Sequence, residues 1–380
     1  MKASSAPHES PLRIGDRNLD VMKPRVRDWL LANLAEAKSV VDVRIATPSS
    51  AGVANETLFV STVTSHGDGP RYVFRLQGEE HLYPNADITF HARVTCEVGR
   101  RSAVPVPRIF GIEDDPSIIG SRFMVMDWVE GRVPPDVPNY HRAGWLKDLP
   151  PAEQEGIWRD CVEKMAALHA MDPANFEFLK EMAITTGQRP DQGRSGLQAV
   201  LQYWDNYAVW CGANQTEIIE YARNWLWSNA PRDRPDAFSW GDARLPNTIV
   251  RDGVCVAILD WDMVSLAGPE ADLAWWALAD HKHTVTQGID RLPGIGSPAE
   301  TIRLWELFSG RPVRDLDWFL VFTAYRQALI TFRLFSLSYT GDALEPDFLT
   351  APGIGFQWLA SLLDLELPGP LTMPFLSLEL

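Results

Sequence analysis

A short hairpin between two helical stretches constrains the fold more than any other feature of this chain. An Arg-Asp-Gly turn at 251–253 separates two β-rich runs, 248–250 and 254–259. An Asp-Gly pair between such runs is a strong hairpin signal. Because a hairpin returns the chain to its starting point, Asn247 before the first strand and Asp260 after the second must emerge at the same end.

Polar residues gather at this end of the predicted hairpin. Asp242 lies in the loop that leads into it, Arg244 follows, and Asp262 comes two residues after Asp260. Phosphoryl transfer needs oxygen ligands for Mg²⁺, a carboxylate that orients the attacking hydroxyl, and a cation that offsets charge. Asn247 follows Asp242 at the spacing of the protein kinase catalytic loop. Singly, these residues are typical of turns and strand ends, but together they predict a catalytic site.

The N-terminal third of the chain has the pattern of a small antiparallel sheet. β-rich runs at 56–63 and 71–76 flank a polar turn, and a short apolar run at 123–128 indicates a further strand. Apolar residues at helical spacing predict a helix over 24–38, and a second helix is predicted over 87–100.

The rest of the chain has a helical pattern, so we predict an α+β fold with two lobes. A loose arm (1–22) precedes a small lobe of antiparallel sheet (23–127), and a larger, mainly helical lobe (128–380) follows. The most apolar late stretch contains Arg326 and Arg333, which favours a buried helix over a membrane span.

Charge and cysteine content narrow the class of partner. Fifty Asp and Glu residues against 35 Lys and Arg give a net charge of −15. This charge argues against nucleic acid or an anionic membrane and is compatible with a cationic small molecule. The four cysteines lack metal-binding spacing, and the N-terminal residues show no signal-peptide pattern. We therefore expect a cytoplasmic protein, and its oligomeric state stays open.

The segment around Asp242 resembles the signature of the aminoglycoside phosphotransferase and choline-kinase-like family. That signature, H-G-D-x-x-x-x-N … D-W-[DE] … G-x-x-x-x-D-L-A, is matched here by segments at 240–247, 260–262 and 268–274. The resemblance covers about residues 45–340. The chain is similar to the branch of this family that includes acyl-CoA-dehydrogenase-linked kinase domains and many actinobacterial members. It implies a protein-kinase-like two-lobe fold with a nucleotide between the lobes.

The resemblance implies transfer of the γ-phosphate of ATP, or of GTP, to a hydroxyl group of a small molecule. Asp242 would be the catalytic base, and Arg244 would lie near the γ-phosphate. Mg²⁺ would be held by Asn247 and Asp260, and Asp272 would hydrogen-bond to the catalytic loop.

The resemblance also implies nucleotide-binding residues in the small lobe. A strand arginine matches the family lysine that holds the α- and β-phosphates, residues 49–55 match the phosphate-covering loop, and residues 126–129 match the hinge that meets the adenine. The residues assigned in this way are Arg75, Ser49, Gly52, Asn55, Met126, Asp127, Trp128 and Val129.

Three departures from the family pattern affect this prediction. Trp240 replaces a histidine that braces the catalytic loop, so we expect activity to survive. Arg75 replaces lysine and is bulkier and forked. No acid lies at 91–93, where the family helix supplies a glutamate, and Glu97 is the candidate replacement. These departures leave a catalytically weak, nucleotide-binding pseudokinase as an alternative.

A metal-dependent glycosyltransferase with a D-x-D motif at 260–262 is a further alternative. It leaves the spacing from Asp242 to Asn247 unexplained.

Several other residues are weaker candidates for the acceptor side of the site. His281 and His283 either line an acceptor pocket or, more often for such a pair, face solvent. His169 is better explained as a hydrogen-bonded core histidine than as a catalyst. Three aromatic residues lie where the family varies for acceptor recognition: Trp204, Tyr207 and Trp210.

Overall fold

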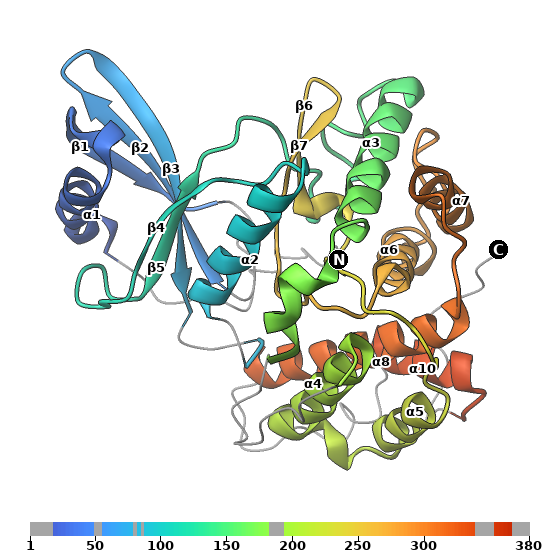
Figure 1. Cartoon of the computed structure of the whole chain (residues 1–380). Coiled ribbons are helices and arrows are strands. Elements are labelled where there is room, and N and C mark those ends of the chain that lie inside the picture. Colours follow the sequence, from blue (N-terminus) through green and yellow to red (C-terminus); the bar gives the residue numbers. More distant parts are fainter. Residues whose placement is uncertain are drawn as a thin grey trace, which may run out of the picture.

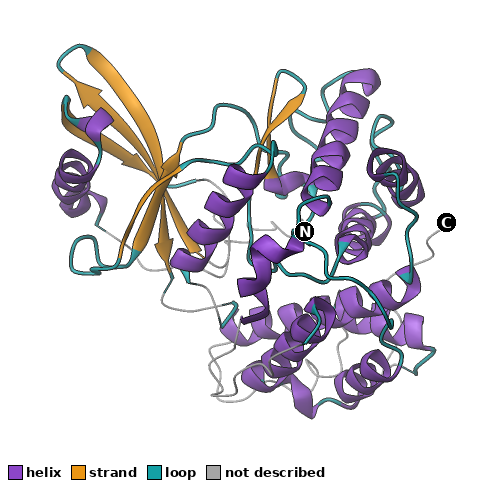
Figure 2. Ribbon diagram, viewed as in Figure 1, coloured by secondary structure: helices purple, strands orange, loops and turns teal. Residues whose placement is uncertain are grey.

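The chain forms a sheet-based lobe and a larger helical lobe (Figures 1 and 2). This computed structural model describes residues 18–48, 55–78, 82–84, 87–181, 194–338 and 353–366. The predicted α+β, protein-kinase-like architecture is confirmed: an antiparallel sheet in the N-terminal lobe is followed by a mainly helical lobe.

The small lobe is built on a five-stranded antiparallel sheet with the strand order β1-β2-β3-β5-β4. β2 (Asn55–Thr64) and β3 (Gly67–Gln77) form the predicted hairpin, and β5 (Phe123–Asp127) pairs with β3. The sequence did not predict the edge strands β1 (Val40–Ala46) and β4 (Ile109–Glu113). Both contain charged residues or a glycine, so neither has the pattern of a buried strand.

Two helices cover opposite faces of this sheet (Figure 1). α1 (Leu19–Asn33) packs Trp29 against the sheet, and α2 (Ile88–Arg101) lies on the face toward the helical lobe. The sequence placed the start of the first helix at Pro24, but the side chain of Asn18 caps it earlier. The last residues of the predicted N-terminal arm are therefore helical.

The large lobe packs its helices into two apolar cores. One core joins α4, α5, α8 and α10, the other joins α3, α7 and the small lobe's α2, and α6 contributes to both. The predicted buried helix is α8, and no helix among the described residues is long and apolar enough to cross a membrane. The helices are α3 (Pro151–His169), α4 (Gly196–Cys211), α5 (Glu217–Ser228), α6 (Pro269–His283), α7 (Pro298–Ser309), α8 (Leu316–Ser338) and α10 (Ile354–Leu363).

The predicted second hairpin, β6 (Thr248–Arg251) and β7 (Val254–Ile258), lies next to the crossing between the lobes. The chain that leaves the small lobe pairs with it, because Arg132 and Val250 exchange backbone hydrogen bonds of 2.8 and 2.9 Å. The polar end of this hairpin is therefore held beside both lobes.

Candidate active site

Asp272 fixes the loop that carries Asp242. Its buried carboxylate, in the first turn of α6, accepts a hydrogen bond from the Ser239 hydroxyl (2.9 Å). It also accepts hydrogen bonds from the backbone amides of Trp240 (2.6 Å) and Gly241 (2.7 Å). A buried carboxylate with several donors holds its neighbours in one arrangement. Asp272 thus makes the contacts with the catalytic loop that the resemblance implied.

His169 completes this network from the other side. Its Nε2 lies 2.7 Å from the Asp272 carboxylate, and its Nδ1 accepts a hydrogen bond of 2.9 Å from the Trp305 indole. The Nε2 atom therefore carries the proton and donates to Asp272. His169 is a core histidine with both ring nitrogens in hydrogen bonds, as predicted.

The backbone before Asp242 requires glycine, and the tryptophan next to it braces the loop. Gly241 has φ +98°, and a Cβ there would lie 2.2 Å from the carbonyl carbon of Met263. The Trp240 indole donates hydrogen bonds to the carbonyls of Leu259 (2.8 Å) and Asp260 (2.9 Å). This tryptophan therefore ties the catalytic loop to the end of β7, a bracing role in place of the family histidine.

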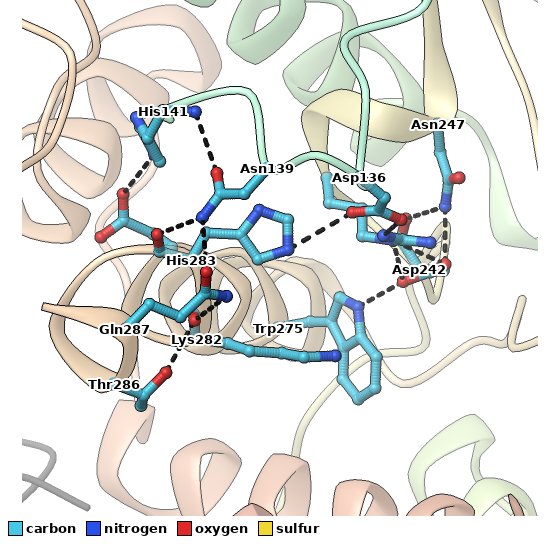
Figure 3. Close-up of polar contacts among 12 residues, drawn as sticks. Asp136, Asn139, His141, Asp242, Asn247, Trp275, Lys282, His283, Thr286 and Gln287 are labelled. Atoms are coloured by element: carbon cyan, nitrogen blue, oxygen red, sulfur yellow. Dashed lines mark hydrogen bonds and ion pairs between the residues drawn. The ribbon is translucent and has the colours of Figure 1, made fainter. Parts of the chain in front are cut away.

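Three side chains hold the Asp242 carboxylate, and Figure 3 labels two of them, Asn247 and Trp275. Arg244 Nε lies 3.0 Å from each carboxylate oxygen, Asn247 Nδ2 donates to one oxygen at 2.6 Å, and Trp275 Nε1 donates to the other at 2.5 Å. The Asp242 side chain is 13% exposed. Its orientation is set before any substrate binds, which is the condition for an efficient base or positioning group.

Arg244 also reaches Asp136, which no sequence pattern had indicated as a site residue. Arg244 Nη1 donates to one oxygen of Asp136, and His283 Nε2 lies 3.3 Å from the other. Burial would lower the pKa of Arg244, but the charges of Asp242 and Asp136 outweigh it and raise the pKa. Asp136 lies more than one hundred residues before Arg244, so no local sequence pattern links the two.

Asn247 and Asp260 emerge at the same end of the hairpin, as its turn predicted. The backbone N–H of Leu259 donates to the carbonyl of Asn247 at 2.9 Å. The Asn247 amide donates to Asp242, which leaves its amide oxygen as a possible metal ligand. Desolvation, reinforced by the charges of Asp262 and Asp242, raises the pKa of Asp260 to about 7.

Helix α2 contributes a histidine where the family pattern predicted an acid. His91 Nε2 lies 2.9 Å from Asp262 Oδ1, without hydrogen-bond geometry, and the two side chains are 5% and 8% exposed. Burial would raise the pKa of Asp262, but the interaction with His91 outweighs it and lowers the pKa. Glu97 pairs with Arg100 and Arg101 instead, so it does not replace the missing glutamate.

The oxygen atoms at this end of the hairpin suit Mg²⁺. Oδ1 of Asp262 is buried without a hydrogen-bond donor, and the pKa of Asp260 is raised partly by neighbouring carboxylates. A divalent cation would give Asp262 Oδ1 a partner and would offset the repulsion between the carboxylates that raises the pKa of Asp260. Among the described residues, no three His, Cys, Asp or Glu side chains form a metal centre. Mg²⁺ commonly uses only one or two protein carboxylates together with substrate phosphates, so the residues present fit this ion.

Arg75, on the small lobe, lies close enough for its charge to act on this acidic end of the hairpin. It lies on β3, is half-buried, and its charge acts to lower the pKa of both Asp260 and Asp262. Its Nε is buried, and no hydrogen-bond acceptor for it is found in the described part of the chain. This placement leaves the guanidinium available for a phosphate group.

The structure describes only some of the other residues that were predicted to bind the nucleotide. Met126 and Asp127 end β5, and the half-buried Trp128 and Val129 lead from it toward the large lobe. Ser49 and Gly52 lie outside the described residues, and only the backbone of Asn55, at the start of β2, is described.

One prediction about the acceptor side needs correction. His281 and His283 are both buried, so they are not a solvent-facing pair. Trp204 and Tyr207, which were weaker candidates for acceptor recognition, lie within the apolar core of the large lobe, where they pack on each other. Trp210 is only partly buried and lies against the Arg333 guanidinium.

Comparison with known proteins identifies the family. A model of the phosphotransferase enzyme family (APH) matches residues 45–296, about two thirds of the chain. The chain belongs to this phosphotransferase family. The predicted enzyme class is therefore confirmed, and the glycosyltransferase alternative is rejected.

The curated relatives of this phosphotransferase are much longer proteins. It is 26% identical over 317 residues to the Arabidopsis thaliana protein named "Probable acyl-CoA dehydrogenase IBR3", covering 77% of this chain and 36% of the relative. It is 26% identical over 254 residues to acyl-CoA dehydrogenase family member 10 of Mus musculus, covering 64% of this chain and 22% of the relative. The phosphotransferase thus spans about a third or less of these relatives.

Solved structures share the fold of this phosphotransferase. A Ralstonia eutropha protein assigned to the aminoglycoside phosphotransferases superposes with a TM-score of 0.60 at 21% identity, covering 89% of this chain and 96% of the other. Plasmodium vivax ethanolamine kinase superposes with a TM-score of 0.56 at 10% identity, covering 88% and 87%. At these identities the similarity shows the fold alone, and it agrees with the two-lobe architecture.

Proposed function

We propose that this phosphotransferase moves the γ-phosphate of ATP, or of GTP, to a hydroxyl group of a small molecule, with Asp242 as the base. The observation that carries the proposal is the Asp242 carboxylate, held by Arg244, Asn247 and Trp275 beside the hairpin end that presents Asp260. Phosphoryl transfer depends mainly on positioning and on electrostatic stabilisation, and this arrangement supplies both.

The proposed step is an in-line displacement. The acceptor oxygen forms a bond to the γ-phosphorus while the bond from that phosphorus to the β–γ bridging oxygen breaks. The nucleoside diphosphate leaves with the electron pair, and the hydroxyl proton passes to Asp242. Arg244, which already contacts Asp242, offsets negative charge that develops on the transferred group.

The nucleotide would be held from both lobes. Asn247 and Asp260 would hold Mg²⁺, which neutralises charge on the nucleotide phosphates when bound. Arg75 would contact the α- and β-phosphates from β3, and the backbone of residues 126–129 would meet the base. The segment 49–55 would cover the phosphates.

The experiment that tests this function is phosphate transfer from Mg-ATP to a library of hydroxyl compounds by the purified chain. We expect stoichiometric appearance of ADP and a phosphomonoester with at least one acceptor. Tight nucleotide binding without transfer to any acceptor would instead favour the pseudokinase alternative, which the departures at Trp240 and Arg75 motivate.

The metal ligands give a separate prediction. Asp260→Ala should weaken the binding of Mg-ATP far more than that of metal-free ATP, because a carboxylate at this position contacts the cation rather than the nucleotide. Calorimetric titration with and without Mg²⁺ measures the difference. Asp252→Ala is the matched control, since both residues have positive φ (+66° and +53°) and Asp252 lies in the exposed hairpin turn. Equal losses with and without Mg²⁺ would make Asp260 a structural residue.

A further inference from the structure

Lys282 lies near Asp242, and no acid of the described residues forms an ion pair with its ammonium group. Lys282 is exposed near the end of α6, two helical turns after Trp275, so the two residues lie on the same face of the helix. Trp275 donates to Asp242, and Figure 3 shows the Lys282 side chain extended along α6 toward Trp275. Burial of the Lys282 ammonium and the charge of Arg244 lower the pKa of Lys282, whereas the charges of Asp136 and Asp242 act to raise it.

The surrounding acids already have other partners. Asp136 accepts a hydrogen bond from Arg244 and lies beside His283, and Asp242 is held by three donors. Asp280, two residues before Lys282 on α6, pairs with Arg291. Within the described residues, no carboxylate lies at ion-pair distance from the ammonium of Lys282.

The backbone of Lys282, by contrast, is fixed. Its carbonyl accepts hydrogen bonds from the Thr286 hydroxyl (2.7 Å) and the Gln287 amide (3.1 Å), and Asn139 donates to Gln287 at 3.3 Å. His283, the next residue, is anchored against Asp136 (Figure 3). The helix end therefore presents a cationic side chain from a fixed backbone, and this side chain extends toward Trp275, which contacts the residue that would receive the acceptor's proton.

We propose that Lys282 binds an anionic group of the acceptor, so that the preferred substrate is a hydroxyl compound that also carries a carboxylate or a phosphate. This inference rests on the proposed function, because it places the acceptor hydroxyl at Asp242 and its anionic group at Lys282. Such an acceptor differs from the cationic small molecule with which the net charge of the whole chain is compatible. An accessible ammonium without an acidic partner is a suitable site for a carboxylate, and the pair forms a charge-assisted hydrogen bond.

The first test compares acceptors that differ only in charge. Hydroxycarboxylates of increasing chain length, their uncharged methyl esters and the corresponding amino alcohols are offered with Mg-ATP to the wild-type protein. We expect kcat/KM to favour the carboxylates. Lys282→Met should lower this preference for carboxylate over ester by about 10–100-fold, mainly through KM. Lys282→Arg should restore most of it, and Lys38→Met, which removes an exposed lysine of the small lobe, should leave it unchanged.

A second readout needs no turnover. Acylation of Lys282 by a lysine-directed reagent is followed by peptide mass spectrometry, with a non-hydrolysable ATP analogue and Mg²⁺ present. Hydroxycarboxylates should protect Lys282, whereas their methyl esters should not, and Lys38 should label equally in every case. Equal labelling of Lys282 with and without carboxylates would overturn the inference. Protection without phosphate transfer to any compound would leave the anion site in place and contradict the proposed function instead.

Discussion

His91 and Asp262 join the two lobes through their side chains. The histidine comes from α2 of the small lobe, and the acid follows the hairpin of the large lobe, with both side chains nearly fully buried. The family pattern places an acid on this helix and a cation on a strand, whereas here the helix supplies the basic group and the loop supplies the acid. Arg75 acts on the same acid from β3, so a cation and a histidine both stabilise the buried charge.

His91→Ala should therefore destabilise the protein. Removing the histidine leaves the buried Asp262 carboxylate with one fewer stabilising partner, at a cost of about 1–3 kcal/mol in the free energy of unfolding. Urea denaturation at neutral pH measures the change. His66→Ala is the control, because that histidine is exposed in the β2–β3 turn. If His91→Ala unfolds at the wild-type urea concentration, the contact with Asp262 contributes nothing to the stability of the fold.

At the scale of elements, turn chemistry was the most informative part of the sequence. The Asp-Gly turn predicted the β6–β7 hairpin and, through it, the closeness of Asn247 and Asp260. The edge strands β1 and β4 were missed because half-exposed strands do not show a strong apolar alternation. The role of Asp136 was missed for a different reason, since its contact with Arg244 forms only when the segment after β5 folds against the catalytic loop.

The contact between that segment and α6 predicts how stability depends on pH. Burial lowers the pKa of His283 to about 4, although Asp136 acts in the opposite direction, and the unfolded chain binds the proton near pH 6.5. Between these values the unfolded state holds more protons than the folded state. The stability that neutral His283 contributes is therefore complete above about pH 6.5 and is lost as the pH falls toward 4.

His283→Gln should reduce this pH dependence. The slope of unfolding free energy against pH, between about pH 4 and 6.5, should fall by up to about 1.4 kcal/mol per pH unit. Denaturant unfolding across this range measures the slope for the wild type, for His283→Gln and for the control His66→Gln. Parallel curves for the wild type and His283→Gln would mean that His283 is protonated in the folded protein.

At the scale of the whole molecule, net charge describes the active site poorly. The chain carries −15, yet Arg75, Arg244 and Lys282 all lie around the carboxylates that would hold the metal and receive the proton. Composition averages over the whole surface, whereas substrate recognition depends on a few groups that the fold brings together. The two-lobe fold and the family could be predicted from the sequence because their motifs are formed by residues close together in the chain. The acceptor side of the site could not be predicted, because its residues come from segments far apart in the sequence.

The most direct test of the central claim is the rate of phosphate transfer from Mg-ATP to an acceptor in Asp242→Asn, compared with the wild type and with Asp252→Asn. The substitution removes the carboxylate that we propose accepts the proton, and it keeps Asn247, Asp260 and Arg75, the residues that we propose hold the nucleotide and its metal. We predict unchanged affinity for Mg-ATP, a fall in kcat of about 10²–10⁴-fold, and wild-type rates for the control. A near-native kcat in Asp242→Asn would contradict the assignment of Asp242 as the base.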